Sequence, residues 1–77
     1  MEINDFIEKF AEQFIDTDAS EFKAETVFKD LEEWSSILAL SVIAMVDEEY
    51  DVTLKGDDVR SSKTIEDLYN IVKNEVK

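Results

Sequence analysis

Two adjacent serines, Ser35 and Ser36, stand directly before a long apolar stretch, and this arrangement constrains the fold more than any other feature. A serine at a helix N-cap accepts a hydrogen bond from a free N–H group of the first turn. Of the two, Ser35 is the better N-cap, and Ser36 would then be the first helical residue. The apolar stretch holds no glycine, proline or basic residue, so we predict one helix from the serines to about Tyr50. The positive end of the helix dipole would then lie at the serine hydroxyls, where a phosphate group is favoured.

Apolar residues occur on more than one side of this predicted helix. The face that we expect to be buried consists of Ala39, Val42, Ile43, Val46 and Tyr50. The residues on other sides are Ile37, Leu40, Ala44 and, less directly, Leu38. A small domain can hardly enclose one helix all round. Either the other helices wrap a central helix, or Ile37 and Leu40 form a docking patch beside the serines.

The composition predicts a single domain, residues 1–77, and excludes several chemistries. The chain has no cysteine and no histidine, which excludes disulfides, cysteine-based metal sites and Ser-His-Asp or Cys-His catalysis. We expect no metal site: Asp16 and Asp18 have the spacing of a calcium loop, but Glu21 and Val27 replace its glycine and closing glutamate. No apolar run is long enough to span a bilayer, so a cytoplasmic protein without membrane contact is expected.

The chain is strongly acidic, with a net charge of -12 from 8 basic and 20 acidic residues. Such a chain is not expected to bind nucleic acid, because it would repel the phosphates. It would instead be steered toward basic surfaces. Residues 30–54 contain acids on both sides of the apolar stretch but no lysine or arginine, which favours a docking surface with an acidic rim.

The segments before the serines predict one helix and one long loop. The helix is expected from Asn4 or Asp5 to Ile15. Its stripe of phenylalanines, most simply explained by core packing, consists of Phe6, Phe10 and Phe14. Polar residues then predict a loop over residues 16–29. The side chains expected to pin this loop to the core are Phe22, Val27 and Phe28.

The segments after the apolar stretch complete an all-α prediction. Residues 52–54 read as an extended connector and residues 57–60 as one short helical turn. Thr64 and Asp67 have the spacing of a capping box for a last helix. The expected buried face of that helix is Ile65, Leu68, Tyr69 and Val72. We therefore predict a four-helix bundle with a long first loop and a short third helix.

Around the serines the chain resembles the acyl carrier proteins. That family opens its second helix with an Asp-Ser-Leu triplet and ends it with an acidic cluster and an aromatic residue. Here Ser35, Ser36 and Ile37 match the triplet, and residues 47–50 match the acidic exit. Upstream, residues 28–31 look like the family's lead-in with phenylalanine and Asp-Leu. The resemblance covers nearly the whole chain in length, charge and helix order.

The resemblance implies a bundle of the acyl-carrier-protein type that is not an enzyme. Its cofactor would be 4'-phosphopantetheine, attached covalently from coenzyme A, which carries acyl groups as thioesters. The spacing back from Tyr50 places the attachment on Ser36. The implied partners of this monomeric carrier are a phosphopantetheinyl transferase and acyl-processing enzymes with basic docking surfaces. The predicted docking residues are Ile37, Leu38, Leu40, Ser41, Ala44, Asp47 and Glu48.

Three positions depart from the family pattern. Ser35 stands where the family usually has aspartate, and Leu38 and Ser41 stand where fatty-acid carriers often have acids. These differences favour a specialised carrier in a fatty-acid or polyketide-type pathway. Aminoacyl and peptidyl carriers, including D-alanyl carriers, share the fold and remain alternatives. So does a non-acylated helical interaction module in which both serines only cap the helix.

Overall fold

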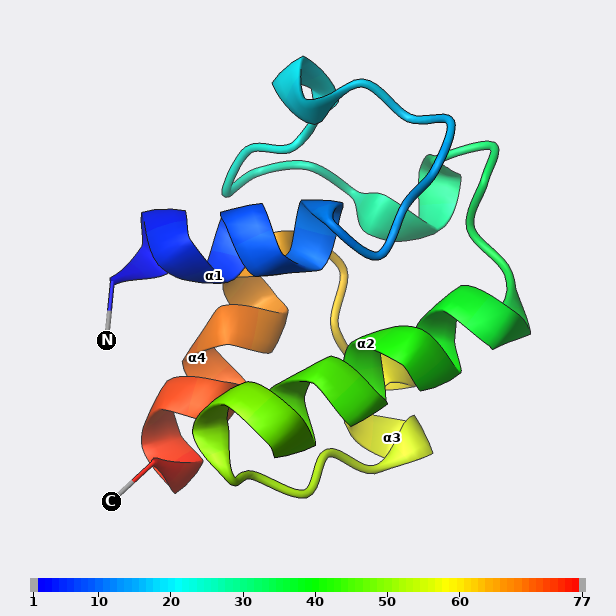
Figure 1. The fold of residues 1–77 in the computed structure, drawn as a ribbon. Coiled ribbons are helices and arrows are strands. Elements are labelled where there is room, and N and C mark those ends of the chain that lie inside the picture. Colours follow the sequence, from blue (N-terminus) through cyan, green and yellow to red (C-terminus); the bar gives the residue numbers. More distant parts are fainter. Residues whose placement is uncertain (1, 77) are drawn as a thin grey trace.

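The computed structural model describes residues 2–76, and within this range the chain forms helices and no β-strand. The four α-helices are α1 (Ile3–Ala11), α2 (Ser36–Tyr50), α3 (Gly56–Ser61) and α4 (Ile65–Glu75). Two short 3₁₀ helices, η1 (Ala19–Glu21) and η2 (Phe28–Asp30), lie in the first loop. Figure 1 shows α1 and α2 running in opposite directions, with the first loop arching above them. The all-α prediction is confirmed.

The core is built around the phenylalanine stripe that begins in α1 and continues into the turn after it, and α1 packs against both α2 and α4. Phe6, Phe10 and Phe14 are all buried, as the spacing predicted. The ring centroid of Phe10 lies 5.5 Å from those of Phe14 and Phe28. The Trp34 ring stacks on Phe10 at 6.4 Å. Since each large ring removes much apolar surface from water, this cluster connects α1, the first loop and the entry to α2.

The predicted bounds of α1 are wrong at both ends. The helix begins at Ile3, before Asn4 and Asp5, and its N-cap Glu2 makes no side-chain capping bond. It ends at Ala11, four residues before the predicted end at Ile15. The N–H of Phe14 donates to the Ala11 carbonyl at 3.0 Å, which is the spacing of a tight turn.

The bounds of α2 are those that the sequence predicts. Ser35 is the N-cap, and the helix runs from Ser36 to Tyr50. Of its predicted core face, Val42 and Val46 are fully buried. The remaining members, Ala39, Ile43 and Tyr50, are partly buried. Asp51 ends the helix in the left-handed region, with φ of 56° and ψ of 40°.

The first loop is anchored to the core and to the start of α4. Phe22 and Phe28 are buried, as predicted, and Val27 is half-buried. Val27 also pairs with Thr64 in an isolated antiparallel bridge. These contacts explain how a long loop keeps one conformation, and they bring η2 toward the segment between α3 and α4.

The C-terminal half follows the predicted pattern closely. In the extended connector Val52 and Leu54 are buried. The short third helix is longer than predicted by one residue at each end and packs against α4. The N–H of Asp67 donates to Thr64 Oγ1 at 3.1 Å, and the N–H of Thr64 donates to Asp67 Oδ2 at 3.0 Å. This capping box is confirmed, and so is the buried face of α4, which consists of Ile65, Leu68, Tyr69 and Val72.

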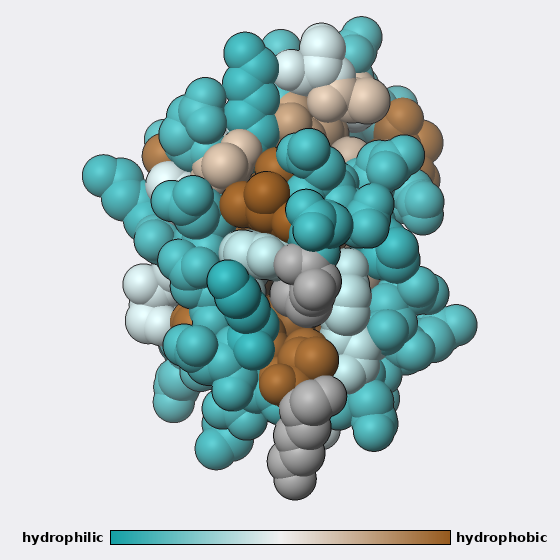
Figure 2. Space-filling view, turned by 90° about the vertical axis from the view of Figure 1, so that its left-hand side faces the viewer, coloured by the Kyte–Doolittle hydropathy of each residue, from teal (hydrophilic) through white to brown (hydrophobic). Residues whose placement is uncertain are grey.

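The exposed surface reflects the acidic composition. Figure 2 shows the side on which α1 begins and α4 ends, where hydrophilic groups surround small, separate hydrophobic patches. The large apolar side chains that residues 2–76 expose are Ile15, Ile37, Leu40 and Val76. Two of the four lie in the first turns of α2, where the sequence placed the candidate site.

Candidate functional site

The two serines occupy different positions at the start of α2. Ser35 has an extended backbone, with φ of -155°, and its Oγ accepts the N–H of Leu38 at 3.3 Å. Ser35 is therefore the capping residue. Ser36 is the first residue of the helix and is exposed, and its hydroxyl takes no part in the cap. Both serines are exposed, but only the Ser35 hydroxyl is engaged in the cap, so that of Ser36 is the better placed for an incoming reagent.

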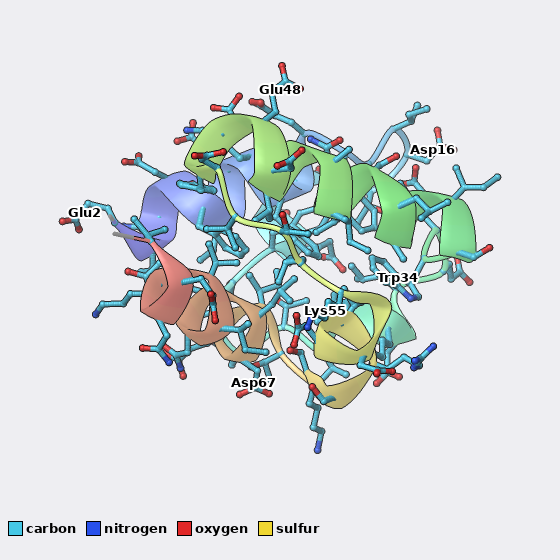
Figure 3. All side chains as sticks on the ribbon, turned by 90° about the horizontal axis from the view of Figure 1, so that it is seen from below. Glu2, Asp16, Trp34, Glu48, Lys55 and Asp67 are labelled. Atoms are coloured by element: carbon cyan, nitrogen blue, oxygen red, sulfur yellow. The ribbon has the colours of Figure 1, made fainter. Side chains whose placement is uncertain are left out.

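An exposed face of α2 begins at Ser36. Ser36, Leu40, Ala44 and Glu48 recur every fourth residue, so they lie in one row along the helix, and all are exposed. Ile37 lies beside this row and is 74% exposed, while Leu40 is 66% exposed. In Figure 3 the Glu48 side chain points away from the bundle. The structure thus brings most of the predicted docking residues onto one surface.

Leu38 does not belong to this surface, and its prediction as a docking residue is wrong. Its side chain is buried in the core. Leu38, Val42 and Met45 are spaced i, i+4 and i+7, so all three face the inside of the bundle. Leu38 is a packing residue, and the exposed face comprises Ile37, Leu40, Ser41, Ala44, Asp47 and Glu48, with Ser41 only half-exposed.

A pocket of about 510 Å³ lies beside Ser36. Ser36 lines it together with the apolar residues Trp34, Ala39, Leu40, Ile43 and Val59, with Gly56, and with the basic residues Lys29 and Arg60. Figure 3 shows Trp34 between the first turns of α2 and the short α3. The pocket, which has a mostly apolar lining, is formed by segments from four parts of the chain. Sequence reasoning did not predict it.

A second, more polar groove lies on the other side of the exposed face. It has a volume of about 320 Å³ and is lined by residues of α1, the turn after it and α2: Lys9, Glu12, Gln13, Ser41, Ala44, Met45, Glu48 and Glu49. Ser41, Ala44 and Glu48 therefore form one wall of this groove. The exposed face of α2 is a ridge between the two hollows, with Ser36 at its N-terminal end.

Glu33 holds the first loop close to the serines. Its Oε2 accepts the N–H of Ile15 at 2.7 Å, and its Oε1 accepts the N–H of Asp16 at 2.9 Å. Oε1 also accepts the N–H of Thr17 at 3.0 Å and the Thr17 hydroxyl at 2.8 Å. The hydrogen bonds to the carboxylate, above all that from Ile15, lower the pKa of Glu33. No local pattern around Glu33 predicts this contact, because a surface glutamate usually faces water.

Comparison of the chain with protein-family models, with curated proteins and with solved structures found no match. None of the helices in residues 2–76 is long and apolar enough to cross a membrane. Within the same range, no group of three or more acidic side chains is placed to hold a metal ion. The chemistry of the site must therefore be inferred from Ser36, the exposed face of α2 and the adjacent pocket.

Proposed function

We propose that this protein is an acyl carrier whose Ser36 bears a phosphopantetheine arm. The observation that supports this most directly is the separation of the two serines: Ser35 caps α2, and Ser36 is exposed as its first residue. An exposed hydroxyl at the N-terminus of a fifteen-residue helix is favourably placed for a phosphate group. The resemblance of residues 35–37 to the carrier triplet points to the same atom.

The attachment is a phosphoryl-group transfer that a separate transferase would catalyse. The Ser36 Oγ attacks the phosphorus of coenzyme A that bears the pantetheine portion, and an O–P bond forms. The P–O bond to the second phosphate of the pyrophosphate breaks, and adenosine bisphosphate leaves. A basic group of the transferase takes the hydroxyl proton. The product is a phosphodiester, and its terminal thiol would hold an acyl group as a thioester.

The exposed face of α2 suits enzymes with basic surfaces around an apolar centre. Ile37 and Leu40 supply the apolar contact area next to the attachment point. Asp47 and Glu48 are exposed further along the same face. With a net charge of -12, the whole chain would speed its encounter with a positively charged partner.

The pocket beside Ser36 favours acyl over aminoacyl cargo. Its lining is mostly apolar, which suits hydrocarbon groups. Its charged residues, Lys29 and Arg60, are both basic and would repel the ammonium group of a D-alanyl or other aminoacyl thioester. We therefore place the protein in a specialised fatty-acid or polyketide-type pathway, with aminoacyl carriers as the second candidate.

The test is the mass of the protein after incubation with coenzyme A, magnesium and a broad-specificity phosphopantetheinyl transferase. We expect one arm on the unmutated protein and none on Ser36→Ala, which should stay folded because Ser35 still caps the helix. Ser35→Ala should still be modified. Its free energy of unfolding should fall by roughly 0.5–2 kcal/mol through the lost cap.

Two results would contradict the proposal in different ways. Modification of Ser36→Ala but not of Ser35→Ala would move the attachment to Ser35. If the unmutated protein is never modified, even by transferases from its own source, the exposed face of α2 would belong to a non-acylated interaction module. Mass spectra of protein isolated from its natural cells would show whether it carries the arm there.

A further inference from the structure

Two of the chain's eight basic residues line the pocket beside Ser36. They come from different segments, Lys29 from η2 and Arg60 from α3. The Lys29 ammonium donates a hydrogen bond to the Arg60 carbonyl, which fixes the lysine on this wall. The Arg60 guanidinium is paired with Asp57, so Lys29 is the basic group of the pocket without a carboxylate partner in residues 2–76.

This placement is unusual for so acidic a chain. No basic residue occurs between Asp30 and Leu54, so neither α2 nor the residues that lead into it supply a cation near Ser36. The fold provides one by bringing η2 and α3 against the first half of α2. Because Lys29 is also exposed, it can reach a ligand at the surface without a large desolvation cost.

We infer that Lys29, assisted by Arg60, is an anion-binding group for the phosphodiester at Ser36. The inference rests on the proposed function and adds to it a positioning residue. The phosphodiester would be bonded directly to Ser36 Oγ, and Ser36 and Lys29 line the same pocket. An ammonium group is a compact point charge with rotatable donors, which suits a tetrahedral anion. The contact would direct the start of the arm toward the apolar pocket.

The experiment uses the protein with its arm attached, a free thiol and no cargo, so that the phosphodiester is the anion under test. Phosphorus NMR records its resonance, and the arm-bearing peptide released by proteolysis gives the reference position for a solvated phosphodiester. We expect the resonance of the folded protein to differ from that of the peptide. In Lys29→Gln it should move toward the peptide position, whereas Lys29→Arg should retain most of the difference.

Lys23→Gln is the matched control, because it removes the same charge from an exposed lysine outside the pocket. It should leave the resonance unchanged. Trp34, the single tryptophan, lines the pocket, so its fluorescence in the arm-free variants reports whether the wall is intact. If Lys29→Gln disturbs that fluorescence, a salt titration of the unmutated protein takes the place of this variant as the test. Added salt should then move the phosphorus resonance toward the peptide position.

Two results overturn the inference. One is a resonance that is the same in Lys29→Gln and in the unmutated protein, and the other is a position that does not respond to salt. Failure of the proposed function is detected earlier and separately, as a mass spectrum without an arm on Ser36. In that case the inference about Lys29 is rejected together with the proposed function.

Discussion

The carboxylate of Glu33 binds Thr17 twice, since Oε1 accepts both the Thr17 N–H at 3.0 Å and the Thr17 hydroxyl at 2.8 Å. Together with the bonds from Ile15 and Asp16, this contact joins the first loop to the residues that lead into α2. Ile15, which is 89% exposed, is thereby held at the surface close to the serine end of α2.

Replacing this carboxylate should lower thermal stability. We expect Glu33→Gln to melt at a lower temperature than the unmutated protein, because a neutral amide accepts these N–H bonds less strongly. Glu32→Gln is the control, as it removes the same charge from an exposed neighbour. Equal melting temperatures for the two variants would show that the contact contributes nothing to stability.

The same contact should make stability depend on pH in the acid range. The pKa of Glu33 is lower in the folded protein than its ordinary value of 4.5. Its contribution is therefore complete above pH 4.5 and is lost as the pH falls through the lower, folded value. In melts between neutral and acid pH, the difference between Glu33→Gln and Glu32→Gln should shrink in that window. A constant difference would contradict this.

Replacing Asp51 with glycine should stabilise the protein. Asp51 is the one residue within 2–76 whose φ is positive and which is not glycine, and it ends a helix whose last turn is already acidic. Asp51→Gly should raise the free energy of unfolding by about 0.5–1 kcal/mol, because glycine adopts this conformation without strain. Asp51→Asn removes only the unfavourable charge at the C-terminus of the helix. Urea unfolding of both variants separates the two effects, and no gain for either would refute them.

Tyr50 carries a buried hydroxyl without a hydrogen-bond partner among residues 2–76. Burial raises the pKa of this phenol, with smaller contributions from the charges of Asp5 and Glu49, so the hydroxyl stays neutral. Its ring lies 6.0 Å from that of Phe6. Tyr50→Phe should keep this packing, remove the unpaired group and raise the free energy of unfolding by roughly 0.5–1 kcal/mol. A loss of stability in urea unfolding would show that the hydroxyl is hydrogen-bonded after all.

Docking of a basic partner should respond to charge on the exposed face of α2. With the transferase as the probe, Glu48→Lys should lower kcat/KM for modification of Ser36, and added salt should reduce the difference. Glu25→Lys, an equal charge change at an exposed position in the first loop, should have a smaller effect. Identical rates for the two variants at low salt would place the docking surface elsewhere.

Features that depend on neighbouring residues could be predicted from the sequence alone. The Ser35 cap, the span of α2 and the Thr64–Asp67 capping box were all predicted correctly, because a cap acts within three residues of its own position. The buried positions of α1 and α4 could likewise be predicted from the spacing of their apolar residues. These features place the exposed Ser36 at the start of a helix without reference to the rest of the fold.

Features that depend on distant segments follow only from the packing of the folded chain. The helix predicted to reach Ile15 ends at Ala11, and Ile15 instead donates its N–H to Glu33, 18 residues further along the chain. Leu38 is buried because α2 turns that side toward the core, although its apolar character alone fitted either side. The pocket beside Ser36 unites η2, α2 and α3, and its Lys29–Arg60 contact spans 31 residues. Such contacts follow from packing of the whole chain, since no local pattern specifies which surface side chains will meet.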